Sequence, residues 1–259
     1  MDEPGFVGKT ILRGRLKLNR MTELKDKSVI ITGASKGIGK ALALRMAADG
    51  ARLALMARSV NELREVQQAV AATGASCQVF AGDVSDEGFV KATVEAVVRT
   101  HSRIDILVNN AGFGIFKESV DISATEWDQV FATNVKGTFL LSNAVIPFMK
   151  KQQSGHIINI ASDVAKRVFA GGSLYCASKY AQDAYSMAIR KELRSSGIKV
   201  SVVYSGLVDS SFHAEPQGHG SHNWWLKNED MANAICFIAS QPPHVVIDEL
   251  MIHPLQQEY

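Results

Sequence analysis

Short apolar and β-branched runs alternate with longer amphipathic stretches from residue 28 onward. The runs are apolar at consecutive positions, as strands are when helices cover both faces of a parallel sheet. Strands are predicted at Ser28–Thr32, Arg52–Met56, Cys77–Ala81, Ile104–Asn109, His156–Ala161, Lys199–Tyr204 and Val246–Ile252. Helices are predicted between them, with starts near Gly37, Val60, Asp86, Ala124, Ser173 and Asn228. This order predicts a doubly wound α/β fold of about seven parallel strands with helices on both faces.

The domain organisation follows from the same pattern. No repeat, linker or change of composition interrupts residues 26–259, which are therefore predicted to form a single domain. Residues 1–25 lack an apolar signal core and are predicted to form a flexible extension, with a targeting arm as the rival interpretation and Met21 as an alternative start of translation. The basic residues of this extension are Lys9, Arg13, Arg15, Lys17, Arg20 and Lys25.

Composition removes several classes of function. The chain is 46% hydrophobic and 21% charged, as packed globular proteins are, and 28 basic against 26 acidic residues give a net charge of +2. That excess is too small to suggest a nucleic-acid surface, and no apolar run is long enough to cross a membrane. Cys77, Cys176 and Cys236 are widely separated, so we expect free thiols in a reducing, cytoplasmic compartment.

A glycine-rich segment, Thr32 to Gly39, follows the first predicted strand and opens the first helix. Glycines at such a corner allow a tight turn and let the backbone approach a pyrophosphate, which the positive end of the helix attracts. The segment predicts a Rossmann-type dinucleotide site. Its candidate binding residues are Gly33, Ser35, Lys36, Gly37, Ile38 and Gly39.

This segment resembles the short-chain dehydrogenase/reductase family, whose glycine motif is TGxxxGxG and which here reads TGASKGIG. Asn109-Asn110-Ala111-Gly112 after the fourth strand is similar to the family's NNAG motif, and Gly82-Asp83-Val84 lies where the family holds the adenine. For Asp83, a helix-capping or turn role is the alternative. Further cofactor contacts implied by the resemblance are Asp83, Val84, Asn110, Ala111 and Gly112.

The end of the second strand bears on which nicotinamide cofactor is used. An acidic residue there would bind the adenosine ribose and repel a 2′-phosphate, whereas this chain has Ala57, Arg58 and Ser59. Arg58 can pair with the phosphate, and Lys36 in the glycine segment supports the same interpretation. NADP(H) is therefore expected rather than NAD(H), with a solvated surface role for Lys36 and Arg58 as the alternative.

Tyr175 and Lys179 are four residues apart, on one face of a predicted helix. A neighbouring ammonium stabilises a phenolate and lowers its pKa, which makes the phenol a proton donor and acceptor near neutrality. The resemblance adds Ser162, thirteen residues before Tyr175, to orient the carbonyl and Asn134 to hold a water relay. The resemblance also implies that Lys179 binds the ribose of the nicotinamide. The sequence thus predicts hydride transfer between NADP(H) and a carbonyl or secondary alcohol.

The corner after the sixth strand departs from the family pattern, because Ser205-Gly206 stands where the family usually has Pro-Gly. The loss of proline is expected to loosen the loop that carries the nicotinamide carboxamide. The resemblance implies cofactor contacts from Gly206, Val208 and Ser210 in this loop. The long connection that follows, residues 205–227, is predicted to be a substrate lid.

The sequence says less about the substrate than about the cofactor. The predicted pocket rim comprises Phe113, Ile115, Phe116, Asp163–Phe169 and Phe212–Trp225. Trp224 and Trp225 in that rim suit either a substrate clamp or packing. No metal site is expected, because the lid histidines His213, His219 and His222 lack acidic or cysteine partners in the sequence.

The chain ends Val245 to Pro254 in a way that looks more like sepiapterin reductase-like and 3-hydroxy acid dehydrogenase-like members than 3-ketoacyl-ACP reductases. Ketoacyl thioesters, pterin-type carbonyls and hydroxy acids therefore all stay open as small-molecule substrates. A non-catalytic, redox-sensing NADP(H) binder is the alternative function. The resemblance implies a homodimer or homotetramer, formed through the helices that contain Asn134 and Tyr175.

Overall fold

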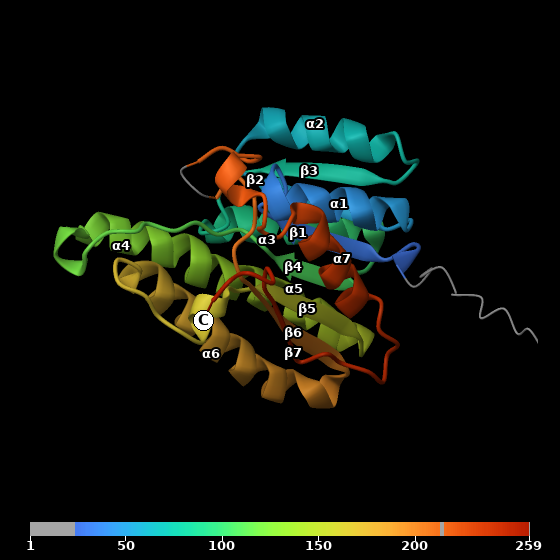
Figure 1. Cartoon of the computed structure of the whole chain (residues 1–259). Helices are drawn as coiled ribbons and strands as arrows, with labels where there is room; N and C mark the ends of the chain where they lie inside the picture. Colours follow the sequence, from blue (N-terminus) through green and yellow to red (C-terminus); the bar gives the residue numbers. More distant parts are fainter. Residues whose placement is uncertain (1–23, 213–214, 259) are drawn as a thin grey trace, which may run out of the picture.

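In the computed structural model, which describes residues 24–212 and 215–258, the strands form one parallel sheet in the order β3-β2-β1-β4-β5-β6-β7 (Figure 1). The strands are β1 Ser28–Thr32, β2 Arg52–Ala57, β3 Cys77–Ala81, β4 Ile106–Asn109, β5 Gly155–Ile160, β6 Ile198–Ser205 and β7 Glu249–Ile252. The order runs outward in both directions from the β1–β4 pair, so the chain switches direction there. The predicted doubly wound fold is confirmed, and such a switch point is where open α/β sheets bind ligands.

Alternating strand positions feed two separate cores. Val29 and Ile31 of β1 pack into one core, whereas Ile30 between them packs into the other. The first core is completed by α1 Gly37–Ala48, α2 Val60–Ala71 and α7 Asn228–Ala239. The second core is completed by α3 Glu87–His101, α5 Gly137–Gln152 and α6 Ser173–Leu193. Because both faces are covered, the inner strands are buried and largely apolar, whereas the edge strands β3 and β7 are only partly buried.

The helix predicted after β4 is not regular along its whole length. It begins as α4 Ala124–Phe131, passes through a π-helical turn at Ala132–Lys136, and continues as α5. A capping box formed by Ser123 and Glu126 starts it. A π turn inserts an extra residue and changes the direction in which side chains point. Asn134 lies in this turn. Short 3-10 turns occupy Ser119–Asp121, Asp163–Ala165, Arg194–Ser196 and Gly220–His222.

Several predicted boundaries differ from the observed ones, most by a single residue and three by more. The fold begins before residue 26, because Leu24 is fully buried in the first core. β4 starts at Ile106 rather than Ile104, and β7 starts at Glu249 rather than Val246, since cross-strand pairing begins only there. The remainder of the predicted extension, including Met21, lies outside the described residues.

The connection predicted as a lid is tied at its base. An isolated bridge joins Val208 to Leu226, and the amide of Asp209 donates to the Leu226 carbonyl at 2.8 Å. The two ends of the loop, one after β6 and one before α7, therefore lie side by side, and the described residues between them extend over the carboxyl ends of the strands (Figure 1).

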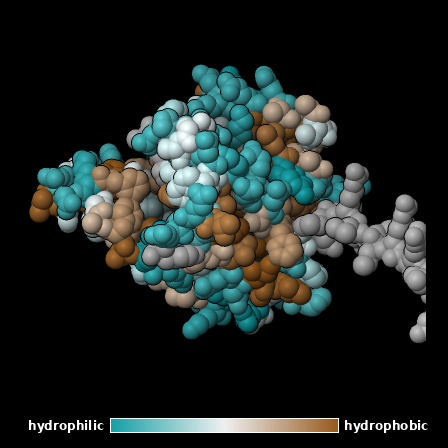
Figure 2. Space-filling model, viewed as in Figure 1, coloured by the Kyte–Doolittle hydropathy of each residue, from teal (hydrophilic) through white to brown (hydrophobic). Residues whose placement is uncertain are grey.

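The surface in the same view is mostly hydrophilic, with hydrophobic areas over the C-terminal part of α7 and at the protruding end near α4 (Figure 2). Phe237 on α7 and Val120 before α4 are exposed. Across residues 24–212 and 215–258, no helix is both long and apolar enough to cross a membrane.

Candidate active site

A single large cavity of about 840 Å³ lies at the carboxyl ends of the strands. It brings together residues from the glycine segment, from the loops after β2, β3, β4 and β5, from α6 and from the loop after β6. The predicted site residues that line it are Gly33, Ser35, Lys36, Gly37, Ile38, Arg58, Ser59, Asp83, Val84, Asn110, Ala111, Gly112, Ser162, Tyr175, Lys179, Gly206, Val208 and Ser210. Gly39 and Asn134 are not part of the described lining.

Close packing explains the glycines of the first loop. A Cβ on Gly33 would lie 2.9 Å from the Ala111 Cα, and a Cβ on Gly39 would lie 2.3 Å from the Gly33 carbonyl oxygen. Gly39 therefore lets the start of α1 pack against the Gly33 carbonyl, and it is not part of the described cavity lining. Lys36 is the N-cap residue of α1, and its side chain makes no cap hydrogen bond. The amides of the first turn of α1, which begins at the cavity, are therefore not capped by this side chain. These donors fit a pyrophosphate.

Thr32 and Asn110 join the glycine segment to the loop after β4. The Thr32 hydroxyl accepts from the amides of Asn110 at 3.0 Å and Ala111 at 2.9 Å. In return the Asn110 side-chain amide donates to the Thr32 carbonyl at 3.0 Å and to the Gly33 carbonyl at 3.2 Å. The Asn110 side chain therefore holds the glycine segment and the loop after β4 together.

The end of the cavity near α2 carries two basic side chains and one acidic side chain. Arg58 and Lys36 are exposed there, beside Ser59, which caps α2 by accepting from the Glu62 amide. Glu62 also lines this end, and the sequence pattern did not mark it. A phosphate is favoured here by the two cations and the start of α2, and is opposed by the Glu62 carboxylate.

Asp83 has the turn role that was the alternative, and it also lines the cavity. Its Oδ1 accepts from both the amide and the hydroxyl of Ser85 at 2.8 Å. Burial opposes the charged form of Asp83, but these hydrogen bonds and the positive charge of Arg58 outweigh it and lower the pKa of the carboxyl. Asp83 is therefore held as a carboxylate.

Ser162 and Tyr175 meet in the cavity. The Ser162 hydroxyl donates to Asp163 Oδ1 at 3.0 Å and lies 3.3 Å from the Ser205 carbonyl. Burial raises the pKa of Tyr175 well above its usual value, and a hydrogen bond with Ser162 offsets this only in part. The phenol is thus held protonated, ready to donate.

Lys179 does not lower the pKa of Tyr175 as predicted. Its ammonium lies 5.8 Å from the centre of the tyrosine ring and donates instead to the Ile160 carbonyl and Gln182 Oε1, each at 3.0 Å. Burial lowers the pKa of Lys179 to about 7. At this distance, desolvation of the phenolate outweighs the attraction of the cation.

Asn134 acts on the backbone behind the cavity. Its Oδ1 accepts from the Phe113 amide at 3.0 Å, and its Nδ2 donates to the Phe113 carbonyl at 2.9 Å and to the Ser178 hydroxyl at 3.0 Å. Gln182, which the sequence pattern did not mark, links Lys179 to Thr138, and the Thr138 hydroxyl donates to the Asn134 carbonyl. Asn134 therefore fixes the loop after β4 against α6.

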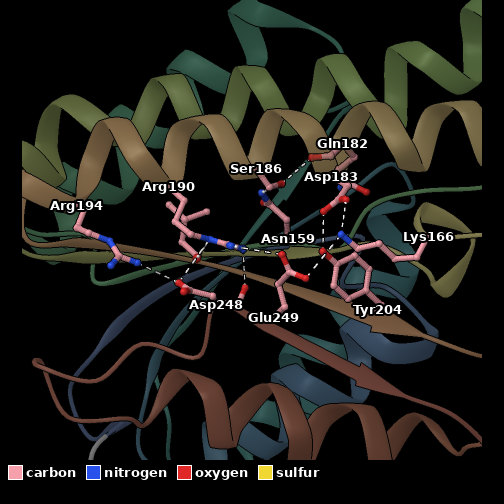
Figure 3. Close-up of polar contacts among 11 residues, drawn as sticks. Asn159, Lys166, Gln182, Asp183, Ser186, Arg190, Arg194, Tyr204, Asp248 and Glu249 are labelled. Atoms are coloured by element: carbon pink, nitrogen blue, oxygen red, sulfur yellow. Dashed lines mark hydrogen bonds and ion pairs between the residues drawn. The ribbon is translucent and has the colours of Figure 1, made fainter.

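A polar network anchors α6, which carries Tyr175 and Lys179, to the edge of the sheet (Figure 3). The Tyr204 hydroxyl of β6 donates to Asp183 Oδ1 at 2.6 Å, and Lys166 contacts Asp183 Oδ2 at 2.8 Å. Further along α6, Arg190 donates to the carbonyls of Val200 and Asp248. These contacts hold the helix in register with β6 and β7.

The C-terminal segment supplies the restraint that the missing proline was expected to remove. Gln257 Oε1 accepts from the Leu207 amide at 2.8 Å, and its Nε2 donates to Asp163 Oδ2 at 2.8 Å. The Gly206 amide donates to the Ile252 carbonyl. A Cβ on Gly206 would lie 2.2 Å from Gln257 Oε1, so only glycine leaves room for this contact.

Replacement of Gln257 by alanine is therefore expected to lower kcat by about tenfold, because it leaves the Leu207 amide and Asp163 short of a partner worth about 1–3 kcal/mol. Steady-state kinetics and thermal unfolding would measure this. Leu255→Ala, at a fully exposed position, is the control. Equal kinetics for the Gln257 and Leu255 variants would show that the contact does not restrain the loop.

Of the two lid tryptophans, Trp225 packs within the loop, whereas Trp224 is exposed. Trp225 stacks on His222 with ring centres 3.8 Å apart, and the described cavity lining includes neither Trp224 nor Trp225. His222 does have an acidic partner, Asp209, at 3.1 Å. Even so, no group of three or more metal-ligating side chains occurs among the described residues, and His213 lies outside them. Ile115 is likewise not in the described lining.

Comparisons with known proteins agree with this geometry. The family model described as short chain dehydrogenase matches residues 27–219. A protein named an uncharacterized oxidoreductase in Staphylococcus aureus is 33% identical over 235 residues, which are 91% of this chain and the whole of that protein.

Solved structures are similar over the same extent. A metagenomic short-chain oxidoreductase in complex with NADP has a TM-score of 0.80 and 33% identity, covering 91% of this chain and all of that one. An alcohol dehydrogenase from Thermococcus sibiricus, complexed with 5-hydroxy-NADP, has a TM-score of 0.85 and 29% identity, covering 90% and 98%.

Proposed function

The chain belongs to the short-chain dehydrogenase family, and on that premise we propose that it is an NADP(H)-dependent oxidoreductase that interconverts a carbonyl and a secondary alcohol. One observation carries the proposal: Ser162, Tyr175 and Lys179 converge on the cavity that the glycine segment also lines. The cofactor is supported by the uncapped first turn of α1 and by the tight approach of Gly33 to the loop after β4.

Each residue has one task in the proposed reaction. Bound NADP(H) supplies the hydride for reduction and accepts it in oxidation. The Ser162 hydroxyl turns from Asp163 to the substrate oxygen and polarises the carbonyl. Tyr175 donates its proton to that oxygen, so the carbonyl gains one hydride and one proton and becomes a secondary alcohol. Lys179 holds the nicotinamide ribose, and Asn134 keeps the loop beside it in place and serves the relay that restores the proton.

A preference for NADP(H) over NAD(H) is proposed from the charges at the end of the cavity near α2. Arg58, Lys36 and Ser59 gather where Ala57 leaves room for a 2′-phosphate. The two neighbouring structures with an NADP-type ligand in their titles support the same assignment.

Arg58→Ala is expected to raise the KM for NADPH about tenfold or more, because a charge-assisted hydrogen bond contributes about 1.5–3 kcal/mol, and to leave the KM for NADH unchanged. The test follows NADPH and NADH oxidation with ketones, diketones, acetoacetyl thioesters and pterin carbonyls. Arg64→Ala is the control, at an exposed position of α2 outside the described lining. Equal effects on the two cofactors would contradict the assignment.

NADPH binding without turnover across this panel would favour the alternative function, a redox-sensing NADP(H) binder. We also propose that the protein forms a homodimer or homotetramer through α5 and α6. Phe139 on α5 and Tyr180 and Met187 on α6 support this, because each exposes a large apolar surface.

A further inference from the structure

Three phenylalanines from three different loops line the cavity beside Tyr175: Phe116, Phe169 and Phe212, here called the phenylalanine collar. Phe116 meets the Tyr175 ring edge-on at 5.5 Å, and Phe212 lies 5.4 Å from it. Phe116 also lies 6.0 Å from Phe169 and 6.2 Å from Phe212. The loops after β4 and β6 thus each place one ring against the group proposed to donate the proton, and the loop after β5 adds a third ring that contacts Phe116.

Gly114 and Gly172 have no Cβ, and this leaves room for Phe116 and Phe169 to lie close to the backbone. A Cβ on Gly114 would lie 2.6 Å from Phe116 Cζ and 3.2 Å from Phe212 Cζ. A Cβ on Gly172 would lie 2.5 Å from Phe169 Cζ. Phe116 and Phe169 nevertheless stay 45% and 41% exposed, and they expose that surface at the mouth of the cavity. Aromatic surface gathered at a cavity in this way is typical of a ligand site.

The charged side chains at this end of the cavity are already paired. Arg167 Nε and Nη2 both donate to Asp163 Oδ2, at 2.9 and 2.5 Å, and Asp163 is buried. Lys179 is engaged with Ile160 and Gln182. A substrate carboxylate at Arg167 would lie beside the negative charge of Asp163 or would strip that buried carboxylate of its partner, and both are costly.

We propose that the substrate is an uncharged carbonyl compound with an aromatic or similarly planar, apolar ring, which the phenylalanine collar holds while its carbonyl faces Tyr175 and Ser162. Edge-to-face contacts with the three rings would supply the affinity and orient the ring. This inference rests on the proposed reduction and narrows it. Among the open substrate classes it disfavours hydroxy acids, because the cations among the described lining residues at this end, Arg167 and Lys179, are already paired.

The first test compares two aryl ketones that differ by one para carboxylate group, acetophenone and 4-acetylbenzoate, by NADPH oxidation. We expect kcat/KM to favour acetophenone by about 50-fold, within the range that apolar pockets reach. Phe116→Ala should lower kcat/KM for acetophenone about tenfold more than it lowers kcat/KM for butanone. Phe237→Ala, the same change at an exposed position of α7, should alter neither.

A binding measurement separates this inference from the proposed function. Benzamide is uncharged and is not reduced, and its binding to the NADP⁺-loaded protein can be followed by ligand-observed NMR, with benzoate as the charged partner. Benzamide binding that Phe116→Ala weakens would support the collar even if no ketone were turned over, in which case the reduction alone would fail. Preference for benzoate or 4-acetylbenzoate, or equal losses in the Phe116 and Phe237 variants, would overturn the inference.

Discussion

Phenylalanine in place of Tyr175 is expected to lower kcat for carbonyl reduction by about a thousandfold, because positioned proton transfer contributes about 10²–10⁴-fold to such reactions. The change removes one hydroxyl and keeps the ring that packs against Phe116 and Phe212. The affinity for NADPH, measured by fluorescence titration, should stay the same, as should the melting temperature. The loss should therefore appear in kcat, with little change in KM.

Tyr180→Phe provides the matched control. Tyr180 lies on α6, five residues after Tyr175, and it is outside the described cavity lining. Its exposed ring belongs to the proposed contact between subunits, and the change removes the same hydroxyl while it keeps that ring. Its kinetics should equal those of the parent protein. Turnover by the Tyr175 variant within a few-fold of the parent would mean that another group donates the proton, and the mechanism proposed above would fall.

Local patterns were enough to predict the fold and most of the cavity. The glycine segment could be placed because a strand, a turn and a helix start are read from neighbouring residues. Arg58 follows β2, Ser162 follows β5, and Tyr175 lies on α6, the helix that leads from β5 to β6. The order of the strands fixes where each of these elements lies. The carboxyl ends of parallel strands meet at one edge, so their following loops meet as well.

Contacts between distant parts of the chain could not be predicted in the same way. Gln257 reaches Asp163 across 94 positions, and no periodicity relates the two. The distance from Lys179 to the Tyr175 ring depends on rotamers set by Gln182 and Ile160, which an i, i+4 spacing does not reveal. Sequence spacing was therefore enough to predict which proposed catalytic groups share the cavity, whereas the pKa shifts of Tyr175 and Lys179 come mainly from burial.

The stability of the protein is expected to fall steeply between about pH 6.5 and pH 3, because a buried histidine must stay neutral in the fold. His156 is almost fully buried, and burial, aided by the charge of Lys199, lowers its pKa to about 3. An unfolded histidine has a pKa of about 6.5. Over this range the unfolded chain therefore binds up to one proton more at His156 than the folded chain does. The unfolding free energy then falls by about 1.4 kcal/mol per pH unit, or on the order of 4 kcal/mol in all. His101, whose pKa burial also lowers, acts in the same direction.

Urea unfolding of His156→Gln between pH 7 and pH 4 isolates this contribution, because glutamine can keep a hydrogen bond to Ser201 without titrating. We expect the variant to lose less stability per pH unit than the parent, even where its stability at pH 7 is lower. His244→Gln is the control, since that imidazole is exposed to water in the folded chain as it is in the unfolded one. Carboxylates titrate equally in all three proteins and cancel in the comparison. Parallel pH profiles for the parent and the His156 variant would show that the folded protein accepts a proton at this position without strain.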